Sequence, residues 1–211
     1  MFNSLLSPDI IFWVPAIAIS LTIHEFSHGY VAYLLGDNTA RNMGRLTLNP
    51  LKHLDPIGFI SLLLFHFGWA RPVPVNPRNF RSIDEKTGTL LTALAGPMSN
   101  IILCFVCVGL LVLIPAKFLY TFSWFYRLLN YLILINASLA FFNLIPVPPL
   151  DGSKILFGLL PNRMYYALQT IEQYGFIILL LLLVARVPET IISPLSMGLI
   201  NSFVKFFALF A

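Results

Sequence analysis

His24 and His28 stand four residues apart, and Glu25 directly follows the first of them. On an α-helix this spacing places both imidazoles on the same face, one above the other. Two imidazoles so arranged suit one zinc ion, and the acid beside them can take a proton from water at the metal. The alternative is a chance match of two core histidines and a stray acid. We disfavour it because three ionisable groups so close together are costly in an apolar helix and usually mark function.

The composition indicates a membrane protein. Of 211 residues, 58% are hydrophobic and only 10% are charged, and the mean hydropathy is +0.83. Such a chain is too apolar for a soluble domain and predicts several spans in a lipid bilayer. The net charge of +4 does not require nucleic acid, because positive residues gather in cytoplasmic loops of membrane proteins. No polar stretch approaches the size of an ordinary domain, so residues 1–211 are expected to form one domain.

The apolar segments predict an all-α polytopic protein with five or six transmembrane helices. The expected spans cover residues 8–35, 88–114, 118–144, 164–185 and 191–211. Gly36 is a natural end for the first of them. His24 and His28 lie in its second half, so the metal is expected inside the membrane, near the side where this helix exits.

The segment 57–69 is apolar but too short to cross a bilayer. If it dips in and returns, the next two spans go out and back, and Asp151 reaches the same side as the histidines. If it crossed fully, Asp151 would reach the opposite side. We expect a re-entrant segment, because 57–69 is too short to span and because Asp151, a candidate for a further metal ligand, must then lie on the side of the histidines.

Prolines alternate through Pro72–Pro74, which predicts a short membrane-associated edge strand over residues 72–76. Val73 and Val75 would present backbone N–H groups on one free edge. An extended peptide chain could bind by adding to that edge as a further strand.

Positive residues set the predicted orientation. Seven of the thirteen Lys and Arg residues lie between the first helix and the span that begins near residue 88, namely Arg41, Arg45, Lys52, Arg71, Arg78, Arg81 and Lys86. This region is therefore expected to be cytoplasmic. The prediction is a multi-pass protein of the cell membrane, with its active site opening toward the cytoplasm.

A catalytic zinc ion needs a third protein ligand and one open position. Asp151 is the best candidate, because it follows a helix end broken by the prolines of segment 146–149. The alternative is that Asp151 caps a short helix over residues 152–160. The residues alone leave these two interpretations open.

Three motifs in order resemble the site-2 protease family of intramembrane zinc metalloproteases, in its short prokaryotic form without PDZ-like or CBS-like domains. They are His24-Glu25-Phe26-Ser27-His28, Gly96-Pro97-Met98-Ser99-Asn100 and the stretch from Asn143 to Gly152. The segments from Asn49 to Gly58 and from Gly68 to Pro77 are also similar to that family. The resemblance covers residues from about 20 to 155.

This resemblance implies one zinc ion per chain, bound by His24, His28 and Asp151, with Glu25 as the catalytic base. It implies substrates that are transmembrane helices of other proteins, cut in regulated intramembrane proteolysis. It also implies that Asn100 and Asn143 line the site, where they would hold the substrate backbone or the developing oxyanion.

Other polar residues carry weaker hypotheses. His53 could approach the metal or gate access to it, but a surface histidine is the alternative. Glu172 belongs to a polar patch that could line a water path. The alternative function is a metal-ion transporter or a metal-binding membrane protein, which would more often show internal repeats and ligands on several spans. We find no repeat, and Glu25 suits hydrolysis better than transport. The sequence does not indicate an oligomeric state.

Overall fold

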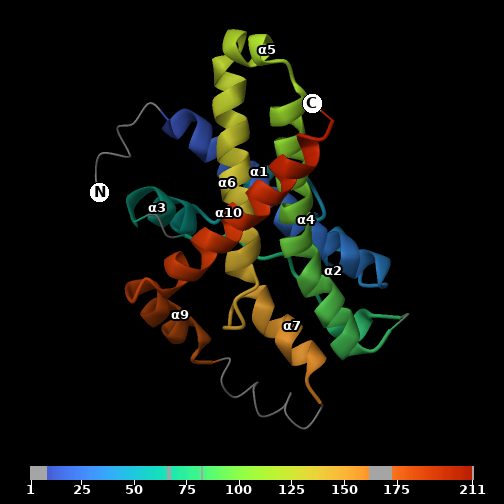
Figure 1. Cartoon of the computed structure of the whole chain (residues 1–211). Coiled ribbons are helices and arrows are strands. Elements are labelled where there is room, and N and C mark those ends of the chain that lie inside the picture. The colour runs from blue at the N-terminus through green and yellow to red at the C-terminus, as the bar shows by residue number, and fades with distance from the viewer. Residues whose placement is uncertain (1–8, 66–67, 82, 162–172, 211) are drawn as a thin grey trace.

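Three long helices form the centre of the computed structural model, which describes residues 9–65, 68–81, 83–161 and 173–210. They are α1 (Ile10–Leu34), α4 (Glu85–Leu113) and α6 (Ser123–Asn143), and each packs against the other two. α10 (Val187–Phe207) runs obliquely across α4 and α6 (Figure 1). The remaining elements are α2 (Thr39–Asn42), η2 (Pro50–Lys52), α3 (Pro56–Phe65), η3 (Pro77–Asn79), α5 (Ala116–Thr121), α7 (Asp151–Leu159) and α9 (Gly175–Val184).

Within the described residues, four helices are long and apolar enough to cross a membrane. They are α1, α4, α6 and the part of α10 from Thr190 to Phe207. The prediction of a helical protein with several membrane-length helices is confirmed. The total of five or six spans stays a prediction, because α9 is short and residues 162–172, which include Glu172, lie outside the described residues.

The faces of α4 and α1 that meet are lined by small residues. The polar or small positions Thr92, Gly96, Asn100 and Cys104 recur every four residues along α4, and all four are buried. Small side chains at this spacing let two helix backbones approach closely, as in other membrane helix pairs. The close approach brings α4 side chains and carbonyls within hydrogen-bonding reach of α1.

Helix α1 ends where the sequence predicts. Gly36 has a φ of +106°, a conformation that glycine adopts without the steric cost other residues meet. Its N–H donates to the carbonyl of Tyr33 at 3.0 Å. The chain therefore turns sharply after Leu34 and brings the polar residues that follow back over the end of the helix.

The two ends of the segment that contains helix α3 lie side by side. Leu54 and Ala70 form an isolated antiparallel bridge, and the Arg71 N–H donates to the carbonyl of His53 at 2.7 Å. A chain that returns to its starting point is what a re-entrant segment requires. The bridge supports that prediction, which stays a prediction.

The strand predicted over residues 72–76 is absent. In the described parts of the chain, the only β pairing is the isolated bridge at Ala70. The physical reason is that Pro72 and Pro74 have no N–H to donate, while the N–H groups of Val73 and Asn76 donate to side-chain carboxylates instead of to a neighbouring strand.

Candidate metal centre

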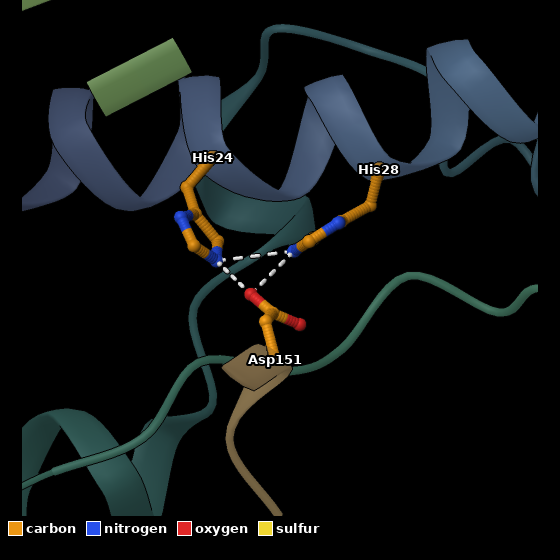
Figure 2. Close-up of side chains that lie close together, drawn as sticks. All are labelled: His24, His28 and Asp151. Atoms are coloured by element: carbon orange, nitrogen blue, oxygen red, sulfur yellow. Dashed lines mark hydrogen bonds and ion pairs between the residues drawn. The ribbon is translucent and has the colours of Figure 1, made fainter. Parts of the chain in front are cut away.

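His24 and His28 project from the same face of α1 toward Asp151 at the start of α7 (Figure 2). The Nε2 atoms of the two histidines lie 3.1 Å apart. Each lies 3.1 Å from Oδ2 of Asp151. All three residues are largely buried, and they form one cluster of possible metal ligands. The structure thus brings together residues that are more than a hundred positions apart in the chain.

Asp151 reaches the histidines because of how α6 ends and α7 begins. The turn from Pro146 to Pro149 stops α6, and α7 starts at Asp151 itself, with Leu150 in the capping position. The helix has no side-chain cap. Asp151 therefore does not cap the helix, and that interpretation is wrong. At the next residue, Gly152, a Cβ would lie 2.3 Å from the carbonyl oxygen of Leu144, so the turn leaves no room for a side chain there.

Each histidine is oriented by a hydrogen bond at its other ring nitrogen. Nδ1 of His28 lies 2.7 Å from the carbonyl oxygen of Thr92, which can only accept, so this nitrogen carries the proton. Nδ1 of His24 lies 2.6 Å from Oδ1 of Asn100 and donates in the same way. In a neutral imidazole the opposite nitrogen then carries a lone pair, and in both rings that nitrogen is the Nε2 facing Asp151.

A buried amide pair fixes the orientation of Asn100. Its Nδ2 donates to Oδ1 of Asn136 at 2.7 Å and to the carbonyl of Ser20 at 3.3 Å. Asn136 in turn donates to the Ser20 hydroxyl and to the carbonyl of Leu132, both at 2.8 Å. Both amides are fully buried. Because the chain of donors ends on backbone carbonyls, Asn100 must present its oxygen to His24.

The atoms that face one another, Nε2 of both histidines and Oδ2 of Asp151, are therefore all acceptors. Oδ2 of Asp151 is buried and has no hydrogen-bond donor among the described residues. Two lone pairs and a carboxylate oxygen at this separation repel one another unless a cation lies between them. Tetrahedral zinc with bonds of about 2.0–2.1 Å separates its ligands by about 3.3 Å, close to the 3.1 Å found here. The residues fit zinc, and three protein ligands leave a fourth position open, as in catalytic sites.

Gly96 makes room for the two rings. A Cβ at this position would lie 2.4 Å from Nε2 of His28 and 2.6 Å from Cε1 of His24. Both distances are far below van der Waals contact, so α4 can approach the ligands only because residue 96 has no side chain.

Glu25 lies outside this cluster of three ligands. It is buried, and its Oε2 accepts a hydrogen bond of 2.8 Å from the N–H of Val73. A position next to His24 lies about 100° round the helix, which directs the carboxylate beside the metal position and not into it. This geometry suits a base better than a ligand.

The other predicted site residues have different positions. Asn100 is fully buried behind His24 with both ends of its amide engaged, so it orients a ligand and does not face a substrate. Asn143 donates to the carbonyl of Leu139 in its own helix at 3.0 Å, and its role toward substrate stays a prediction. Val73 does not offer a free N–H, because that group is bound to Glu25. The Val75 N–H has no partner among the described residues.

His53 is not a surface histidine, and that interpretation is wrong. Its side chain is fully buried, and its Nε2 donates to the carbonyl of Thr47 at 2.7 Å. The turn at Asn49, whose side chain accepts from the Leu51 N–H, folds the chain back over this histidine. It is not part of the metal cluster.

Sequence reasoning did not assign Asn136 to the site. Asn136 carried a signal that could have identified it, since an amide in an apolar helix usually has a buried partner.

Comparison with known proteins agrees with the chemistry of this site. Residues 120–185 match the model for peptidase family M50. The protein named "Putative zinc metalloprotease YwhC" from Bacillus subtilis (strain 168) is 42% identical over 199 residues, which cover 92% of this chain and 90% of that protein. "Zinc metalloprotease MJ0392" from Methanocaldococcus jannaschii is 29% identical over 163 residues, 76% of this chain and 38% of that protein. No solved structure matches the chain.

The chain belongs to the site-2 protease family of zinc metalloproteases, peptidase family M50. The relatives named here are all called zinc metalloproteases, and none is called a transporter.

Proposed function

We propose that this metalloprotease hydrolyses peptide bonds within or next to transmembrane helices of other membrane proteins. The observation that carries the proposal is the position of the ligands: His24 and His28 lie inside α1, a helix of membrane length, and not on a loop or a separate domain. A peptide bond can reach such a site only if its own chain enters the membrane.

An apolar cavity beside the catalytic face of α1 supports this class of substrate. It has a volume of about 900 Å³, and its lining includes Leu21, Trp69, Ile135 and Met197. Leu21 lies four residues before Glu25, so the two share one face of the helix. A helix about 10 Å wide takes about 120 Å³ per residue at 1.5 Å rise, so the cavity has room for about two turns of an apolar helix.

The chemistry follows from the positions of the buried groups. A zinc ion held by His24, His28 and Asp151 would supply a Lewis acid for the scissile carbonyl and the attacking water. Glu25 accepts the proton of that water and later delivers it to the leaving amine nitrogen. The substrate must unwind locally beforehand, because a helix hides its carbonyls in its own hydrogen bonds.

The proposed setting is a multi-pass protein of the cell membrane with its site open to the cytoplasm. The support is the charge distribution, since seven of the thirteen Lys and Arg residues lie between α1 and the first turns of α4. Water would enter from the side on which these residues lie.

The test uses the purified, zinc-loaded chain in detergent with a panel of transmembrane peptides. We expect cleavage that stops when a zinc chelator is added and returns with zinc. Glu25→Gln should retain zinc and lose cleavage, because the amide still accepts the Val73 hydrogen bond but cannot take a proton. Cleavage that persists in Glu25→Gln would reject the mechanism. Cleavage of soluble peptides alone would reject the proposed substrates.

A further inference from the structure

The segment from Arg71 to Asn76 has no regular secondary structure, yet it delivers a backbone N–H to the catalytic carboxylate. The Val73 N–H lies 2.8 Å from Oε2 of Glu25. Backbone hydrogen bonds to carboxylates are among the stronger ones in proteins. Since no neighbouring strand holds this segment in register, its position must be set by other contacts.

Arg45 holds the beginning of the segment. Its guanidinium Nη2 donates to the carbonyl of Arg71 at 2.7 Å and to that of Pro72 at 3.2 Å. Only 8% of the Arg45 surface is exposed. The two carbonyls directly precede Val73, so this guanidinium fixes the chain immediately before the N–H that meets Glu25.

Asp37 holds the end of the segment. It is fully buried, and its Oδ2 accepts the Asn76 N–H at 2.7 Å. Its Oδ1 accepts from the side chain of Asn79 at 2.8 Å and from the Thr39 N–H at 3.0 Å. The carboxylate therefore binds both the segment and the turn that follows it.

The buried charges of Arg45 and Asp37 are compensated by hydrogen bonds and not by ion pairs with other described residues. Among the described residues, Arg45 and Asp37 form no salt bridge with an oppositely charged side chain. Burying a charge is costly unless hydrogen bonds compensate it, and here most of the compensation comes from residues 71–79. Gly29 lets the same segment approach α1, since a Cβ there would lie 2.9 Å from Cγ1 of Val73.

We propose that Arg45 and Asp37 are positioning residues that hold segment 71–76 at both ends, so that the Val73 N–H keeps the Glu25 carboxylate aimed beside the metal centre. The inference rests on the proposed function of Glu25 as the base. A glutamate side chain has several rotatable bonds, and fixing it in advance removes an entropic cost from the chemical step. The loss of either contact should therefore slow catalysis without removing a zinc ligand.

The experiment compares Arg45→Met and Asp37→Asn with the parent chain, each purified in full length and loaded with zinc. Met keeps most of the Arg stem but loses both donors, and Asn loses one of the two acceptor oxygens. We measure bound zinc, kcat per bound zinc, KM for a transmembrane peptide, and hydrogen–deuterium exchange of the peptide that contains residues 71–76. Arg41→Met and Asp84→Asn are matched controls, because both side chains are outside the metal centre: Arg41 bonds to Tyr33, and Asp84 caps α4 by accepting from the Thr87 N–H.

We expect both test variants to keep full zinc and to exchange faster at residues 71–76. Their kcat per bound zinc should fall by up to about 100-fold, as for a displacement of about 1 Å in a catalytic group. KM should change by less than about twofold, since the substrate cavity is intact. The controls should match the parent in all four measurements. Arg45→Lys, which keeps the charge and a donor, should recover part of the lost kcat.

Two results would overturn the proposal. One is normal kcat per bound zinc in a variant whose segment exchanges faster, which would show that catalysis does not need the segment in place. The other is unchanged exchange in both variants, which would show that these side chains do not hold it. A role in folding alone would lower the zinc-bound fraction and leave kcat per bound zinc unchanged. If the parent itself does not cleave, the proposed function fails, while the exchange measurement still decides whether Arg45 and Asp37 hold the segment.

Discussion

Replacement of Gly96 by alanine is the sharpest test of the metal centre, because it adds a single methyl group. A Cβ at residue 96 would lie 2.4 Å from Nε2 of His28 and 2.6 Å from Cε1 of both His24 and His28. The nearest groups are the imidazole rings themselves, which are already held by Thr92 and Asn100. Neither ring can rotate away without breaking its hydrogen bond.

The size of the effect follows from the geometry. Ordinary contact with a Cβ begins at 3.4 Å, so the ring of His28 must retreat by about 1 Å, whereas metal–ligand distances tolerate about 0.2 Å. The loss of a supporting hydrogen bond alone weakens metal binding by about 10- to 100-fold. Since Gly96→Ala displaces a ligand directly, we expect zinc affinity to fall by at least about 100-fold, or about 2.8 kcal/mol.

The assay is a competition titration of the metal-free protein in detergent against a fluorescent zinc chelator. Gly198→Ala is the matched control, because it makes the same substitution in α10 at a position with nothing within 4 Å. We expect the control to bind zinc like the parent and to be slightly more stable, by up to about 1 kcal/mol, as alanine is a better helix former.

Parental zinc affinity in Gly96→Ala would refute this reasoning. It would mean that α4 moves away from α1 at little cost, and that the contact between Gly96 and the two rings does not constrain the site. An equal loss of affinity in Gly198→Ala would point to a general effect of glycine replacement.

Three further predictions concern other parts of the structure. Asn136→Leu removes the amide that holds Asn100, so zinc affinity should fall by about 10- to 100-fold; an unchanged affinity in the same titration would contradict the network. Asp151→Asn should lose zinc while circular dichroism shows intact helices, because this residue does not cap α7; full zinc occupancy after dialysis against a weak chelator would disprove the ligand role. Burial raises the pKa of Asp37, but hydrogen bonds from Thr39 and from residues 76–79 outweigh burial and hold the pKa below its ordinary 3.8. The charged form of Asp37 is thus the one that stabilises the fold. Asp37→Asn should therefore melt at a lower temperature than the parent near pH 7, and the gap between the two melting temperatures should shrink as pH falls below 3.8. A gap that stays constant at all pH values would count against a stabilising Asp37 charge.

The sequence by itself determined the local part of the site. Two histidines four residues apart must share a helix face, because the helix repeats every 3.6 residues. Gly36 ends α1 because a left-handed turn there needs glycine. The length of segment 57–69 and the number of spans also predicted that Asp151 would lie on the same side of the membrane as the histidines. That it binds the metal with them was implied only by the family resemblance.

Tertiary structure decided which polar residues support the ligands. Asn136 and Asn143 are seven residues apart on α6 and share a face, so the sequence treats them alike. Only the packing of α6 against α1 sets Asn136 level with Ser20 and Asn100, and leaves Asn143 bonded within its own helix. The axial position of one helix relative to another depends on side chains from both, and no local pattern records it.

The same reason explains why the strand prediction was wrong. The alternating prolines fixed which residues of segment 72–76 could donate a backbone hydrogen bond, because proline has no N–H. They could not indicate the acceptors. Glu25 lies 48 residues before Val73, and Asp37 lies 39 residues before Asn76. Only the fold brings these carboxylates to the Val73 and Asn76 N–H groups.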